Sequence, residues 1–169
     1  TQGPGHSRYI EGSMKAFPEA TNWGITGHLE HPSAANVRFD GMLDRDARKL
    51  PAALGVFMVG GSQLPEALVL HRPTSLLVIQ DLVAHNANNP MRPFFSRLYS
   101  VAFGVVDRVG FHAFQPMAWS NLRMLHRDVD RVVESDFERV TAAHWPLAPQ
   151  SPTALRKTLG WLRTLSPLA

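Results

Sequence analysis

Two titratable side chains follow short apolar segments that lie far apart in the chain. Asp81 comes soon after the apolar run 76–79, and His144 directly follows the strand-like segment 137–143. A buried, unpaired carboxylate costs several kcal/mol. We therefore expect Asp81 to lie at a solvated strand end, to be paired, or to bind a metal. Two strands that deliver such side chains at their C-terminal ends would form a site at the rim of an α/β sheet.

The elements that would position these side chains can be predicted from apolar spacing and turn residues. The runs 67–70 and 76–79 flank a polar link and predict a buried hairpin. Further strands are predicted at 21–25, 55–59 and 137–143. Helices are predicted at 10–17, 91–106, 119–134 and 153–164, with a short helical segment capped within 44–46 and ending at Pro51. The apolar helix 91–106 is expected to pack against the sheet. This order predicts a layered α/β domain.

The composition limits the class of protein. The 169 residues, 44% hydrophobic, predict one domain over 1–169 with a substantial core. The chain has no cysteine, so disulfides and thiolate metal sites are excluded. The net charge of +3 comes from scattered basic residues, and no basic and aromatic cluster predicts nucleic-acid binding. We expect no membrane partner, a cytoplasmic location, and a processed, cloned or truncated start at Thr1.

Several sequence stretches together resemble a known superfamily. LLVIQDLV at 76–83 precedes an Arg-rich two-helix segment, and DFERVTAAHWPL at 136–147 precedes a closing helix. RFDGML at 38–43 and KAFPEA at 15–20 lie upstream. In this order they resemble the C-terminal part of the metallo-β-lactamase superfamily, and more closely a branch of it that is poor in metal motifs. The resemblance runs from about His6 to Trp161. It implies an αββα sandwich whose first sheet is incomplete, either truncated or supplied by a partner chain.

The resemblance also implies a reduced metal site. The family motif His-x-His-x-Asp-His, aligned through AFPEA, places His6 at its Asp and Ser7 at its last His. Asp81 matches the bridging Asp and His144 the final His. The Gly-His-Thr turn of the family corresponds to residues 60–63, which contain no His. One metal position has therefore lost its His ligands, while the other would retain His6, Asp81 and His144.

That ligand set suggests a chemistry. Two imidazoles and one carboxylate suit Zn or Fe and leave positions open for water or substrate. A metal-bound water of lowered pKa would be the nucleophile for hydrolysis. The alternative is an Asp81–His144 pair, bonded to one another or to backbone, that holds no metal.

Other candidates have simpler interpretations. His71 and His85 are expected to be surface or loop residues, and so are His28 and His31. The turn 60–62 would bind an anion through its backbone or be an ordinary turn. The aromatic residues of 94–103 would line an acyl pocket or belong to the core. Three arginines spaced by four residues predict a solvated helix face or a clamp for an acidic ligand; they are Arg123, Arg127 and Arg131.

Two functions remain open. The first is a hydrolase-like protein that acts on a small ester, lactone or related acyl compound through one metal ion. The second is a non-catalytic binding or assembly module on the same scaffold. A homo-oligomer is expected, because a partner chain would complete the sheet.

Overall fold

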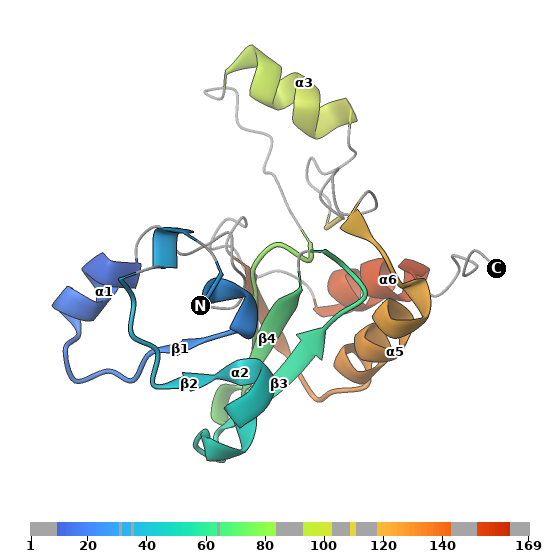
Figure 1. Ribbon diagram of the computed structural model, residues 1–169. Coiled ribbons are helices and arrows are strands. Elements are labelled where there is room, and N and C mark those ends of the chain that lie inside the picture. The colour runs from blue at the N-terminus through green and yellow to red at the C-terminus, as the bar shows by residue number, and fades with distance from the viewer. Residues whose placement is uncertain are drawn as a thin grey trace.

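The computed structural model describes residues 10–30, 32–34, 36–63, 65–83, 93–102, 109–110, 118–142 and 152–162. Its elements are α1 (Ile10–Ala16), β1 (Trp23–Gly24), β2 (Gly41–Met42), α2 (Leu43–Asp46), β3 (Leu54–Val59), β4 (Glu66–His71), β5 (Leu76–Ile79), α3 (Phe94–Ala102), α5 (Leu122–Val133), β6 (Arg139–Ala142) and α6 (Pro152–Leu162). Single 3-10 turns lie at Thr26–His28, Pro32–Ala34, Ala47–Lys49 and Arg72–Thr74. The chain is thus mixed α/β (Figure 1), as predicted.

A four-stranded sheet in the order β3-β4-β5-β6 forms the centre of the fold. β3, β4 and β5 pair antiparallel, and β6 pairs parallel to β5. The predicted hairpin is confirmed as β4 and β5, and its turn closes through Ser75 in the left-handed conformation, at φ 47°. The last described pair of the parallel ladder joins Ile79 to Ala142. The C-terminal ends of β5 and β6 therefore lie at the same edge of the sheet.

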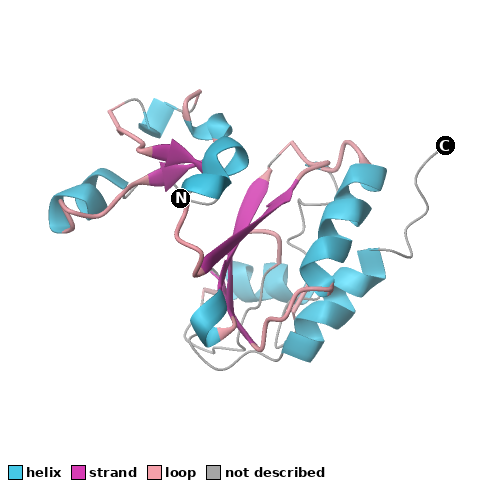
Figure 2. Cartoon of the chain, turned by 90° about the horizontal axis from the view of Figure 1, so that it is seen from below, coloured by secondary structure: helices cyan, strands magenta, loops and turns pink. Residues whose placement is uncertain are grey.

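One face of this sheet packs on two helices. Side chains alternate along each strand, so Leu77 and Ile79 of β5 share a face with Val140 and Ala142 of β6. This face contacts α5 and α6, and together they form the larger core. Figure 2 shows both helices on one side of the sheet. The buried members of this core are Val59, Leu68, Leu70, Leu77, Ile79, Leu82, Val83, Leu125, Val129, Val132, Phe137, Val140, Ala142, Leu155 and Leu159.

A smaller N-terminal layer covers the other face at β3 and β4. Buried Ile25, Leu43 and Ala67 form a second core, and Val56 and Val69 pack against it. β1 and β2 pair parallel in a separate two-stranded sheet, which Figure 2 shows on the side away from α5 and α6. In the described part of the chain, the layer opposite the helices therefore contains a sheet of two short strands.

The short helix α2 starts earlier than predicted. It begins at Leu43 with Met42 as its N-cap, and no side chain in the described part of the chain caps it. Within 44–46, Asp46 is the N-cap residue of the following 3-10 turn Ala47–Lys49, but its side chain makes no capping hydrogen bond there, because both carboxylates of this segment bond elsewhere. Asp44 accepts bonds from the backbone N and the Oγ1 of Thr26, at 3.1 and 2.5 Å. Asp46 accepts from the backbone N of Met42 at 3.1 Å. Asp44 thus ties α2 to the turn after β1.

The helix α3 does not pack as predicted. Its side chains Phe94, Phe95, Leu98 and Val101 are exposed, and Figure 1 shows α3 set apart from the sheet. The predicted helix spanned 91–106, of which 91–92 and 103–106 lie outside the described residues. Apolar spacing predicts an apolar face but does not say what covers that face. Within the described residues, no helix is long and apolar enough to cross a membrane.

One arginine joins α6 to the segment between α5 and β6. Arg156 donates to the carbonyl oxygens of Val133, Ser135 and Phe137, at 3.4, 3.1 and 2.9 Å. Its guanidinium also lies 4.0 Å from the centre of the buried Phe137 ring. Arg156 therefore satisfies the Val133 carbonyl at the end of α5 and two carbonyls of the segment that follows it.

We expect Arg156→Met to lower the free energy of unfolding by roughly 2–4 kcal/mol, because part-buried carbonyls lose a charged donor. Urea denaturation measures this change. The exposed neighbour Lys157 supplies the control: Lys157→Met should change stability by no more than about 0.5 kcal/mol. Equal effects of both substitutions would contradict the assigned role of Arg156.

Candidate functional site

A buried carboxylate holds the turn that follows β5. Glu66, the first residue of β4, is only 5% exposed. Its Oε1 accepts from the backbone N of Gln80 at 2.5 Å, and its Oε2 accepts from the backbone N of Asp81 and Leu82, at 2.9 and 2.7 Å. Three consecutive backbone donors thus converge on one side chain. The conformation of the chain at Asp81 is fixed by this contact.

The surroundings of Glu66 act on its pKa in opposite directions. Burial raises the pKa of this carboxyl to about 7, the three backbone N–H donors lower it, and the nearby Asp81 raises it. Burial is the largest of these effects. The carboxyl is therefore poised to titrate near neutral pH, where most glutamates are fully ionised.

Glu66 was not among the residues predicted from the sequence. The signal was present, because a carboxylate stands directly before the apolar run 67–70. A charged group beside a core strand needs a partner. This applies to Glu66, at the start of a strand, as well as to Asp81, which follows a strand. Here the partner is the backbone at the end of the next strand.

Asp81 lies two residues beyond the end of β5 and is partly buried. Its neighbour Gln80 places Oε1 in a buried position without a hydrogen-bond partner in the described part of the chain. The predicted ligands His6 and His144 lie outside the described residues, as does His85. Among the described residues, no three His, Cys, Asp or Glu side chains are grouped as metal ligands. Of the three predicted metal ligands, Asp81 is therefore the one that lies within the described residues.

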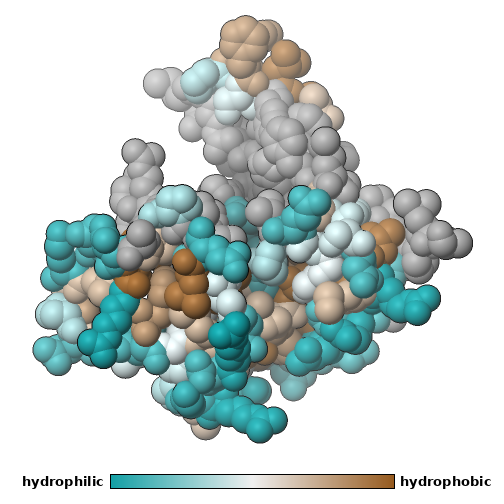
Figure 3. Space-filling view, in the orientation of Figure 1, coloured by the Kyte–Doolittle hydropathy of each residue, from teal (hydrophilic) through white to brown (hydrophobic). Residues whose placement is uncertain are grey.

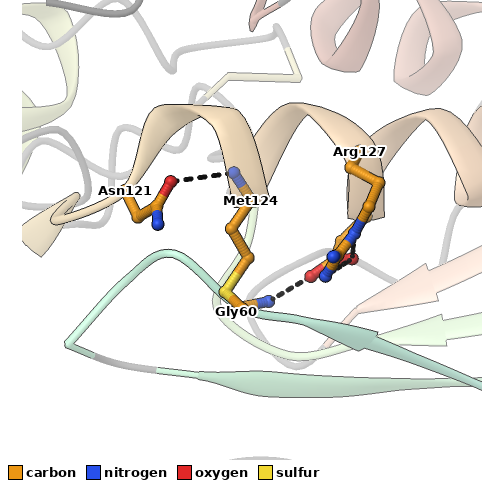
Figure 4. Close-up of polar contacts among 5 residues, drawn as sticks. Gly60, Asn121, Met124 and Arg127 are labelled. Atoms are coloured by element: carbon orange, nitrogen blue, oxygen red, sulfur yellow. Dashed lines mark hydrogen bonds and ion pairs between the residues drawn. The ribbon is translucent and has the colours of Figure 1, made fainter.

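The turn after β3, at Gly60, Gly61 and Ser62, packs against the start of α5. The Gly61 carbonyl oxygen accepts from the backbone N of Ser120 and Asn121, at 2.9 and 3.1 Å. Gly61 has a φ of 76°, and a Cβ there would lie 2.3 Å from the Asn121 oxygen. The chain thus needs glycine at this position. Asn121 in turn caps α5 by accepting from the backbone N of Met124, at 3.0 Å (Figure 4).

The anion that this turn binds belongs to the chain itself. Asp128 on α5 is 4% exposed, and its Oδ2 accepts from the backbone N of Gly60 at 3.0 Å (Figure 4). Its Oδ1 lies 2.9 Å from the Arg127 guanidinium. Of the two interpretations of this turn, a site for an external anion or an ordinary structural turn, the contacts support the structural turn. Arg127 is exposed, as predicted, but it neutralises a buried carboxylate instead of being only solvated.

Two described histidines, His28 and His71, have structural surroundings, whereas the Nε2 of His126 is buried without a hydrogen-bond partner in the described part of the chain. His28 is buried, with Nδ1 3.0 Å from the backbone N of Ile25, and its ring lies 5.5 Å from that of Phe39. The expectation of a loop histidine is wrong there, because the 3-10 turn directs the ring inward. His71 is partly exposed and bonds Thr74 Oγ1 at 2.7 Å. This agrees with the surface or packing role predicted for His71.

The chain matches no protein-family model, no curated protein and no solved structure. Its function is therefore inferred from the geometry at the end of β5.

Glu66 makes a pH-dependent contribution to stability whose sign can be stated. Its pKa is about 7 in the folded chain against an ordinary value of 4.5, so the folded chain binds more protons between these pH values. Its contribution to the free energy of unfolding therefore falls as the pH rises through that window. We expect urea denaturation of the wild type to show this decline, and Glu66→Gln to show a smaller one.

Glu11 provides the control for this experiment, since its carboxylate is exposed on α1 and pairs with Lys15 at 3.1 Å. Glu11→Gln should keep the wild-type pH dependence. A Glu66→Gln curve parallel to that of the wild type would show that Glu66 is not the titrating group.

The close contact at Gly61 yields a second prediction. Gly61→Ala should destabilise the chain by more than the roughly 1–3 kcal/mol cost of a left-handed residue with a side chain, because the new Cβ also meets a backbone oxygen. By contrast, a Cβ added at Gly12 in α1 would meet nothing within 4 Å among the described residues. Gly12→Ala should be neutral or stabilise α1 by up to about 1 kcal/mol. Thermal denaturation of both variants tests the contrast, and a Gly61→Ala variant as stable as the wild type would contradict it.

Proposed function

We propose that the chain is a hydrolase-like protein of the metallo-β-lactamase fold that acts on a small ester, lactone or related acyl compound. One metal ion, Zn or Fe, would be held by Asp81, His144 and His6. The observation that supports this most is the parallel pairing of β5 with β6. Ile79 and Ala142 are partners, and Asp81 and His144 each follow their strand by two residues. The C-terminal ends of β5 and β6 therefore share one edge of the sheet, and Asp81 lies at that edge.

The donor chemistry of the three residues fits such an ion. One carboxylate oxygen and two imidazole nitrogens satisfy Zn or Fe and leave room for water. Asp81 is partly buried at the sheet edge, so its carboxylate is not sealed in the core. Glu66 is the other carboxylate in this region, but both of its oxygens already accept backbone N–H groups. We therefore assign Glu66 no role as a ligand.

The proposal gives the three ligands and Glu66 separate roles. A bound metal would supply a Lewis acid and a water of lowered pKa. Asp81 would bind the ion, and Glu66 would keep the backbone of the Asp81 turn in place. His144 and His6 would complete the ligand set. A rigid backbone matters here because a ligand displaced by a fraction of an ångström weakens metal binding.

The alternative is a non-catalytic binding or assembly module with a degenerate metal site. The turn 60–62 favours this alternative, because it has no His and its backbone bonds α5 and Asp128. Under this alternative the protein would hold no metal, and a partner chain would complete the layer opposite α5 and α6. Sedimentation analysis that shows a stable homodimer without metal would favour the module.

Metal content distinguishes the two functions. We expect purified wild-type protein, reconstituted with Zn or Fe, to hold about one equivalent by mass spectrometry, the stoichiometry of a single three-ligand site. Asp81→Ala and His144→Ala should each lose most of this metal, since two ligands from protein rarely retain the ion. Hydrolysis of model esters and lactones should be lost with it.

His71 supplies the control, because it bonds Thr74 in the hairpin turn and is no proposed ligand. His71→Ala should keep the wild-type metal content. Absence of metal from the reconstituted wild type, or retention of metal in both ligand variants, would rule out the metallohydrolase.

A further inference from the structure

The helix α3 has a sharply divided surface. Phe94, Leu98 and Val101 recur at intervals of four and three residues, so they share one helix face, and Phe95 adjoins it. Ser96 lies on the opposite side of the helix, and Arg97 lies at the edge of the apolar face, next to Phe94 and Val101. The rings of Phe94 and Phe95 pack edge to face, with centroids 5.6 Å apart. This division is typical of a helix that buries its apolar side against something.

The apolar face of α3 is nevertheless exposed. Phe94 is 69% exposed, Phe95 80%, Leu98 53% and Val101 66%. Figure 3 shows apolar surface at the top of the molecule, where Figure 1 places α3. Clustered exposed aromatic and aliphatic side chains mark an interaction site more often than single exposed ones do.

The charge of the segment identifies the kind of surface that it fits. The chain has 14 acidic residues in total, yet residues 82–106 contain none. The same stretch contains Arg92 and Arg97. In the described residues Arg97 has no ion pair, whereas Arg127 and Lys49 do. An acid-free, basic segment with exposed phenylalanines complements a surface that is apolar below and anionic above.

We propose that α3 binds the surface of a membrane that carries anionic lipids. Phe94, Phe95, Leu98 and Val101 would enter the acyl boundary, and Arg97 would bind the headgroups. A helix of nine residues lies in the interface and does not cross the bilayer. This departs from the expectation of no membrane partner, which considered only spanning segments. The proposal does not depend on the proposed hydrolase.

A second copy of the chain is a poorer match for this face. Four exposed side chains on a nine-residue helix bury far less than the roughly 800 Å² per partner of a stable interface. Two copies of α3 packed through this face would also bring the Arg97 charges of the two chains toward each other. A lipid surface needs no such area and attracts the same arginines.

Vesicle co-sedimentation tests the proposal on the full chain. The probes are phosphatidylcholine vesicles with and without phosphatidylserine, at low and high salt. We expect the wild type to bind the phosphatidylserine vesicles, and binding to weaken with salt and without the anionic lipid. The double variant Phe94→Ser, Phe95→Ser should bind roughly tenfold less or weaker still, because two side chains lose apolar burial. Arg97→Glu should weaken binding as well.

Phe17 provides a matched control, since it is 67% exposed and lies outside α3. Phe17→Ser should bind like the wild type. Thermal denaturation should show all variants folded, because the substituted side chains are exposed. Failure of the wild type to bind either vesicle, or equal binding by the double variant, would overturn the proposal. A dimer that the double variant abolishes, without vesicle binding, would overturn it in favour of a second copy.

Discussion

The bond from Glu66 to the turn after β5 is the contact on which the candidate site depends. A carboxylate removed from water must recover its hydration energy from the protein. Glu66 does so through three backbone donors from residues 80–82. These same donors would be unsatisfied where the β5 ladder ends. The buried Glu66 carboxylate thus gains hydrogen-bond donors and at the same time satisfies the backbone N–H groups at the end of β5. It also fixes the direction in which the chain leaves the sheet at Asp81.

The sheet then brings distant segments to that point. β5 and β6 are separated in sequence by α3 and α5, yet they pair parallel and in register. A parallel pair needs a long crossover, and the chain between these strands supplies it. The crossover places α5 on the same face as α6, where Leu125, Val129 and Leu155 fill the core. Arg156 of α6 then bonds the segment that connects α5 to β6.

Two buried carboxylates of this fold join distant segments of the chain. Asp128 and Glu66 are both nearly buried carboxylates that accept backbone N–H bonds from a turn. Asp128 joins α5 to the turn at Gly60, and Glu66 joins β4 to the turn at Asp81. The first turn has thereby become part of the scaffold. The second still presents a partly exposed carboxylate at the sheet edge, which is why we place the candidate chemistry there.

Local sequence determined most elements of this protein. Alternating and clustered apolar residues predicted the hairpin, β3, α5 and β6, because side-chain period follows directly from backbone geometry. Turn residues placed their ends to within a few positions.

Only the tertiary structure decided which partner each polar or apolar group has. Apolar spacing placed a helix at α3 but not its exposure, since burial depends on what other segments cover. Glu66 and Asp128 were not identified because their backbone donors lie 14 and 68 residues away. The Asp44 carboxylate likewise bonds Thr26, a partner 18 residues away that the local sequence does not indicate. A sequence specifies local conformation through neighbours, whereas these contacts exist only once distant segments are packed together.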